Sequence, residues 1–96
     1  MTAEFLVTTT SRFDRELKKL AAKHPGPPEM FRQVIVILKA DPYNRGRQHP
    51  IKKLEAVATG EGQYRIRTGR FRFRYDIDGR TVVLKACSLR REDSYR

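Results

Sequence analysis

The chain has 96 residues, which is enough for one small domain with a modest core. Its 21 Lys and Arg against 11 Asp and Glu give a net charge of +10, so we expect a polyanionic partner. The 39% hydrophobic content argues against a disordered basic tail. No run approaches the roughly 20 apolar residues of a membrane span.

The N-terminus lacks the layout of a signal peptide, because no basic segment precedes a long apolar run. The single cysteine, Cys87, cannot form an internal disulfide. We therefore expect one cytoplasmic domain spanning residues 1–96, with a reduced thiol and no membrane partner. Two isolated histidines and one cysteine do not make a metal site, and we expect no cofactor.

The first half of the chain predicts a strand followed by two helices. Residues 4–8 (EFLVT) are rich in strand formers. Ser11 is the expected N-cap of a helix that runs to about Lys23, where the proline-rich HPGPP segment ends it. Pro28 opens a second helix, and Asp41 and the proline after it end this helix. The short break between the helices predicts an αα-hairpin.

The second half predicts mostly strands. A basic loop over residues 43–50 leads to a short extended piece, residues 51–54. Residues 63–74 (QYRIRTGRFRFR) read as a hairpin with a tight turn at TGR. Asp78 followed by glycine signals a second turn, and residues 81–87 are apolar on both faces, as in a central strand.

Within the first hairpin, arginines alternate with apolar residues. Side chains alternate between the two faces of a strand, so Arg65 and Arg67 share one face of the first strand, and Arg72 and Arg74 share one face of the second. The aromatic and aliphatic residues between them enter the core on the other face. An array of guanidinium forks at strand spacing suits phosphate oxygens, so we expect this face to bind a nucleic-acid backbone.

These elements predict an α+β fold of the order β-α-α-β-β-β. Two N-terminal helices pack on one face of a mainly antiparallel sheet, and the arginines lie on the open face. The parity of Lys85 and Arg91 along the last strand places both on this face if no bulge intervenes.

The chain resembles toxins of the RelE/ParE superfamily of bacterial toxin–antitoxin pairs. The resemblance covers nearly the whole chain and rests on the RIR-turn-RFRY hairpin combined with a terminal R-x-x-x-Y, Arg91 to Tyr95. In the RelE branch, toxins cut messenger RNA, usually on the ribosome, without a metal ion. The resemblance implies catalytic roles for five residues: Arg65, Arg67, Arg72, Arg91 and Tyr95.

In this scheme Arg72 and Arg91 clamp the reacting phosphate, and Arg65 and Arg67 position flanking phosphates or assist proton transfer. Tyr95 is the candidate general base or a stacking platform for a base. Neighbouring cations are expected RNA contacts: Lys52, Lys53, Arg70, Arg74, Lys85 and Arg90. The expected partners are an acidic cognate antitoxin, messenger RNA on the ribosome with contacts to ribosomal RNA, and operator DNA through the antitoxin complex.

Two other functions remain open. The ParE branch shares the fold and poisons DNA gyrase, so fold alone does not decide the target. The chain could also be an inactive member that binds only its antitoxin or operator DNA. The Arg91 to Tyr95 ending favours RNA cleavage. Each arginine also has a plainer reading as a solvated or antitoxin-binding residue, and Tyr95 as a frayed terminal residue.

Overall fold

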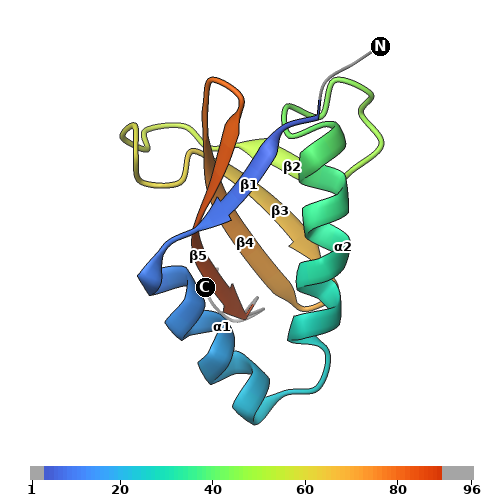
Figure 1. Ribbon diagram of the computed structural model, residues 1–96, viewed down its shortest axis with the longest axis vertical. Coiled ribbons are helices and arrows are strands. Elements are labelled where there is room, and N and C mark those ends of the chain that lie inside the picture. The colour runs from blue at the N-terminus through green and yellow to red at the C-terminus, as the bar shows by residue number, and fades with distance from the viewer. Residues whose placement is uncertain (1–3, 90–96) are drawn as a thin grey trace.

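Two helices cover one face of a five-stranded sheet in the computed structural model, which describes residues 4–89 (Figure 1). The elements are β1 (Leu6–Thr9), α1 (Ser11–Lys23), α2 (Pro27–Ala40), β2 (Ile51–Lys53), β3 (Tyr64–Thr68), β4 (Phe71–Asp78) and β5 (Thr81–Leu89). The strand order across the sheet is β1-β5-β4-β3-β2. β1 pairs with β5 in parallel and all other pairs are antiparallel. The α+β architecture expected from the sequence is confirmed.

The strand count differs from the expected β-α-α-β-β-β order, because the extended piece near residue 51 is a strand in its own right. β2 pairs with β3 through the register Ile51 to Ile66 and Lys52 to Arg65, so it forms an edge of the sheet. β5 runs to Leu89, two residues further than expected, and lies between β1 and β4.

Helix α1 begins one residue earlier than predicted, because Thr10 and not Ser11 is the N-cap. Thr10 has extended backbone angles, and its hydroxyl oxygen accepts a hydrogen bond from the Phe13 N–H at 3.1 Å. The same hydroxyl donates to the Leu84 carbonyl at 3.2 Å, so the cap also fixes the start of α1 against β5.

The core lies between the helices and the sheet. Phe13 on α1 packs against Phe31 on α2 and Phe73 on β4, with ring centroids 5.4 and 5.9 Å apart. The fully or nearly fully buried apolar residues are Phe13, Val34, Leu38, Ile66, Phe71, Phe73, Tyr75, Val82, Leu84 and Cys87. Burial raises the pKa of the Cys87 thiol to about 12, with a smaller contribution from the Glu16 carboxylate, so it is a core residue and not a nucleophile.

Among residues 4–89, no helix lies on the other face of the sheet, which we call the uncovered face. Since alternate residues of β3 and β4 enter the core, the residues between them point to this uncovered face. Among residues 4–89, neither helix has the length and apolar character that crossing a membrane requires.

Candidate nucleic-acid interface

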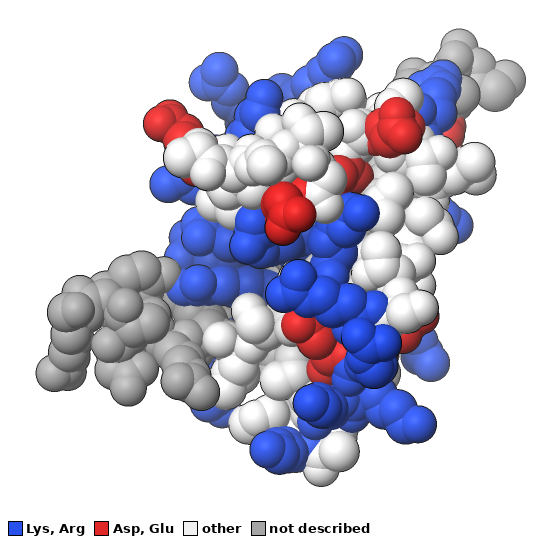
Figure 2. Space-filling view, turned by 90° about the vertical axis from the view of Figure 1, so that its left-hand side faces the viewer, with Lys and Arg blue, Asp and Glu red and all other residues white. Residues whose placement is uncertain are grey.

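Four arginines form two directly opposed pairs on the uncovered face. Arg65 lies opposite Arg74, and Arg67 lies opposite Arg72, in the register of β3 and β4. Directly opposed residues have Cβ atoms about 4.5–5.5 Å apart, so the four arginine side chains leave the sheet from adjacent positions. We call these four residues the arginine block, and it confirms the facing predicted from the alternation of the sequence. Figure 2 looks onto this face and shows Lys and Arg gathered in a continuous patch.

The strands on either side extend this surface. Lys52 on β2 lies opposite Arg65, so one row across the sheet carries three cations. On the other side, the small residues Ala86 and Ser88 lie opposite Arg74 and Arg72. Small neighbours leave space for the guanidiniums to reach a ligand above the sheet. The Arg67 backbone N–H donates to the Pro50 carbonyl at 3.1 Å. Within the described part of the chain, its guanidinium makes no hydrogen bond or ion pair, so these donors are available.

Arg74 anchors the loop that precedes β3. Its guanidinium donates hydrogen bonds to the backbone carbonyls of Glu61 (2.9 Å) and Gly62 (3.0 and 3.1 Å). Two positions along the same face of β4, the buried Asp76 carboxylate accepts from the N–H groups of Gly62 (3.0 Å) and Gln63 (2.9 Å). Together they hold the loop of residues 54–63 against the uncovered face, so this loop forms a wall beside the arginine block.

The loop approaches the sheet closely enough to require a glycine. Gly62 is buried and has a φ of +84°, which side chains rarely adopt. A Cβ atom at this position would lie 3.0 Å from the Arg74 Cβ atom and 3.3 Å from its Nε atom. A glycine is therefore needed both for the backbone angle and for the contact.

The sheet has a β-bulge that interrupts the alternation of faces along β5. The register steps from Arg74 opposite Ala86 to Tyr75 opposite Leu84, which leaves Lys85 as the extra residue. Lys85 itself lines a cavity of about 200 Å³ beneath the loop, on the uncovered face as expected. Beyond the bulge, however, Cys87 faces the core. The parity argument for Arg91 required an unbroken strand, and this condition is not met. Arg91 itself lies outside the described residues.

Several predicted contacts lie away from the arginine block or outside the described residues. Lys53 lies on the other side of the sheet, with its ammonium 5.8 Å from the ring centroid of Tyr64. Arg70 is exposed in the turn between β3 and β4. The remaining predicted site residues lie outside residues 4–89, so the geometry does not place them: Arg90, Arg91 and Tyr95.

The described part of the chain offers no obvious general base beside the block. Tyr64 and Tyr75 lie on the helix-covered side and stack with centroids 5.5 Å apart. Burial raises the pKa of both phenols, further for Tyr75, so neither serves as a base near neutral pH. Residues 4–89 also hold no group of three or more His, Cys, Asp or Glu side chains that could bind a metal ion. What the site offers chemically is dense positive charge for phosphate groups.

Sequence analysis missed Asp76 and Gly62. Asp76 shares the parity of Arg72 and Arg74 and is the first acidic residue on that face of β4. Its partners lie 13 and 14 residues earlier in the chain. An acid within a basic strand face is a signal that could have indicated a loop anchor.

Comparison with known proteins gives similarity in structure only. No protein-family model matches the sequence, and no curated protein matches it. Three solved toxin–antitoxin complexes contain a chain of similar structure. The archaeal RelE–RelB complex of Pyrococcus horikoshii has a TM-score of 0.68 and 21% identity, covering 92% of this chain and 97% of that chain. The RelBE2 complex of Mycobacterium tuberculosis has a TM-score of 0.60 and 25% identity, covering 94% and 95%.

The third is the RelB–RelE antitoxin–toxin complex of Methanococcus jannaschii, with a TM-score of 0.58 and 20% identity over 85% of this chain and 88% of that chain. In each case the similarity extends over most of both chains. These similarities confirm the RelE-like fold expected from the hairpin and the order of elements.

Proposed function

We propose that this chain, which has the fold of the RelE-like toxin superfamily, is the toxin of a toxin–antitoxin pair and cleaves messenger RNA. The observation that carries the proposal is the arginine block. Directly opposed like charges destabilise a sheet, so two such pairs on one uncovered face indicate a site kept for an anion. Planar guanidinium forks match the oxygens of a phosphodiester.

RNA supplies its own nucleophile for this reaction. The 2′-hydroxyl loses its proton and attacks the adjacent phosphorus, the bond to the 5′ oxygen breaks, and that oxygen is protonated as it leaves. The products are a 2′,3′-cyclic phosphate and a 5′-hydroxyl end. Since no external nucleophile has to be generated, the protein needs only to orient the strand, offset the charge that grows on the phosphate and move two protons.

The roles of individual residues follow from position and from the family resemblance. Arg72 lies in the middle of the uncovered face and is proposed to bind the reacting phosphate, with Arg65 and Arg67 on flanking phosphates. The roles of Arg91 as a second phosphate clamp and of Tyr95 as general base or stacking platform rest on the resemblance alone. Arg74 is proposed to act mainly by holding the loop that flanks the site.

The proposed partners are an acidic antitoxin and messenger RNA held on the ribosome. The three similar structures are all complexes with an antitoxin. A net charge of +10 and an open arginine face favour an acidic protein segment that covers this surface. An adjacent small reading frame that encodes acidic segments and a DNA-binding motif would support the assignment to a toxin–antitoxin pair. The DNA-binding motif of the antitoxin would then bring the complex to operator DNA. Ribosome dependence would follow if the ribosome supplies the strand orientation that this small protein lacks.

Primer extension on cellular messenger RNA after brief induction tests the function. Wild type is compared with Arg72→Ala and with the double variant Arg91→Ala/Tyr95→Phe. Lys39→Ala serves as control, because Lys39 is exposed on α2. We expect new 5′ ends within coding regions for wild type and the control. Arg72→Ala should reduce their rate of appearance by about 10²–10³-fold, as loss of one transition-state donor does.

Growth arrest by wild type without new RNA ends would contradict RNA cleavage. It would point to the gyrase-directed alternative, which a DNA supercoiling assay would then test. Unchanged cleavage by Arg72→Ala would remove the arginine block from the mechanism.

A further inference from the structure

A second basic surface lies beside the arginine block, between the C-terminal half of α1 and the end of β5. A groove of about 440 Å³ runs there, lined by residues that include Lys19, Lys23, Ser88 and Leu89. Ser88 lies directly opposite Arg72 across β5 and β4. The groove is therefore continuous with the site proposed to hold the reacting phosphate.

The groove combines an apolar floor with a cationic rim. Leu20, Leu89 and His24 supply apolar and aromatic surface, and the His24 ring is fixed by an edge contact with Phe71, with centroids 6.3 Å apart. Lys19 and Lys23 are exposed at the rim. A flat base with an attached phosphate has the same combination of an apolar face and an anionic edge, and base stacking on such surfaces tolerates many sequences.

Among the described residues that line the groove, the one acidic side chain, that of Glu16, is already hydrogen-bonded. One carboxylate oxygen of Glu16 accepts a hydrogen bond from the Cys87 N–H at 2.8 Å, and the other accepts from Arg12 Nε at 3.1 Å. Within residues 4–89, neither Lys19 nor Lys23 makes an ion pair. Within this part of the chain, the positive charge at the rim is therefore available to a ligand.

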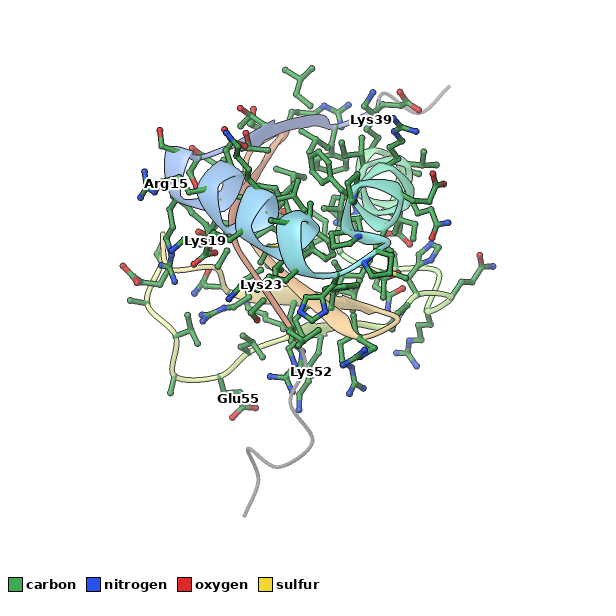
Figure 3. All side chains as sticks on the ribbon, turned by 90° about the horizontal axis from the view of Figure 1, so that it is seen from below. Arg15, Lys19, Lys23, Lys39, Lys52 and Glu55 are labelled. Carbon is green, nitrogen blue, oxygen red and sulfur yellow. The ribbon has the colours of Figure 1, made fainter. Side chains whose placement is uncertain are left out.

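The cations of α1 are also arranged in a row. Arg15, Lys19 and Lys23 recur every four residues, so they lie on one side of the helix and span about 12 Å at 1.5 Å per residue. Figure 3 shows the three side chains following one another along one side of α1, with Lys39 away from them on α2. The space-filling view shows that the basic patch of the sheet continues across this region.

We propose that this groove binds a nucleotide of the substrate RNA strand next to the segment on the arginine block, with Lys19 and Lys23 on its phosphates. The proposal rests on the RNA-cleaving function proposed above and extends it, because it commits the protein to a substrate strand that continues beyond the cleaved bond. The strand would pass from Arg72 over Ser88 into the groove.

Binding of a fluorescent, fully 2′-O-methylated RNA of about 12 nucleotides tests the proposal, because this probe lacks the nucleophile and is not cleaved. Wild type is compared with Lys19→Ala/Lys23→Ala. The control is Lys18→Ala/Lys39→Ala, which removes the same charge; Lys18 is exposed on α1 but does not line the groove. For single strands, a plot of the logarithm of the binding constant against the logarithm of the salt concentration falls with a slope of about 0.7 per phosphate contact. Since the groove variant loses two contacts, we expect its slope to be lower by about 1.4. The control should keep the wild-type slope, and a dinucleotide probe should bind all three proteins equally.

An equal loss of slope in both double variants would overturn the proposal, because the effect would then be one of net charge. A wild-type slope for the groove variant would overturn it as well. A defect that appears only with ribosomes, and not with free RNA, would assign these lysines to ribosomal RNA and also overturn it. This experiment measures binding, so its outcome is independent of the cleavage assay. A wild-type protein that makes no new RNA ends but binds RNA through the groove would contradict the proposed function and still support the groove as an RNA site.

Discussion

At the scale of single residues, Tyr75 shows how a polar group is accommodated in the core. The side chain is fully buried, and its hydroxyl donates a 2.7 Å hydrogen bond to the Pro42 carbonyl. Burial raises the pKa of the phenol above its usual value, so the proton needed for this bond stays in place. The bond fixes the start of the loop after α2 to the middle strand of the sheet, on the side away from the arginine block.

We expect Tyr75→Phe to lower the free energy of unfolding by about 1–3 kcal/mol, because the buried Pro42 carbonyl would lose its donor. Urea unfolding followed by circular dichroism measures the change. Tyr64→Phe is a matched control, since Tyr64 is half-buried, stacks on the same ring and donates no hydrogen bond from its hydroxyl within the described residues. Similar losses in the two variants would mean that the bond to Pro42 contributes nothing of its own.

At the scale of elements, the loop of residues 54–63 depends on two side chains of β4. Asp76 accepts the Gly62 and Gln63 N–H groups with its two oxygens, so Asp76→Asn leaves one of these groups without an acceptor. We expect a loss of about 1–3 kcal/mol and a loop that detaches from the sheet. Limited proteolysis by a glutamate-specific protease would show this, because the exposed Glu55 and Glu61 lie in the loop.

Asp78→Asn is the control for this experiment, because Asp78 lies two residues further along β4, is exposed and makes no hydrogen bond with its side chain within residues 4–89. Its cleavage rate should match wild type. If Asp76→Asn is cleaved no faster than Asp78→Asn, the loop is held by its other contacts, such as those from Arg74.

Some features of the sheet and of the candidate site were predictable from the sequence and others were not. The hairpin and the facing of Arg65, Arg67 and Arg72 were predictable, because a period of two and a glycine turn are local signals. The bulge at Lys85 was not, since one extra residue leaves no mark in the composition of a strand that is apolar on both faces. The hydrogen bonds from Asp76 to the loop join residues 13 and 14 positions apart. No local sequence pattern links residues so far apart. The roles of Arg91 and Tyr95 came from resemblance and remain predictions.

At the scale of the whole molecule, the high net positive charge is expected to lower the stability of the fold. A net charge of +10 on a small domain disfavours the compact state through self-repulsion, and the arginine block concentrates that repulsion in two directly opposed pairs. The helices and the core lie on the other face of the sheet. Proteins that keep such a site for a ligand are commonly stabilised when the site is altered.

Arg67→Gln tests whether this repulsion lowers stability, because Arg67 lies directly opposite Arg72. Its side chain makes no hydrogen bond or ion pair within the described part of the chain. Removing one of two opposed like charges should stabilise the fold by about 0.2–1 kcal/mol, or about 1–5 °C in Tm for a domain of this size. The gain should be largest at low salt and shrink as salt screens the remaining charges. RNA binding should weaken in the same variant. Arg47→Gln, on an exposed loop position, should change neither quantity by as much. A lower Tm for Arg67→Gln at low salt would show that Arg67 stabilises the fold, and the interpretation of the block as a site kept at the expense of stability would be wrong.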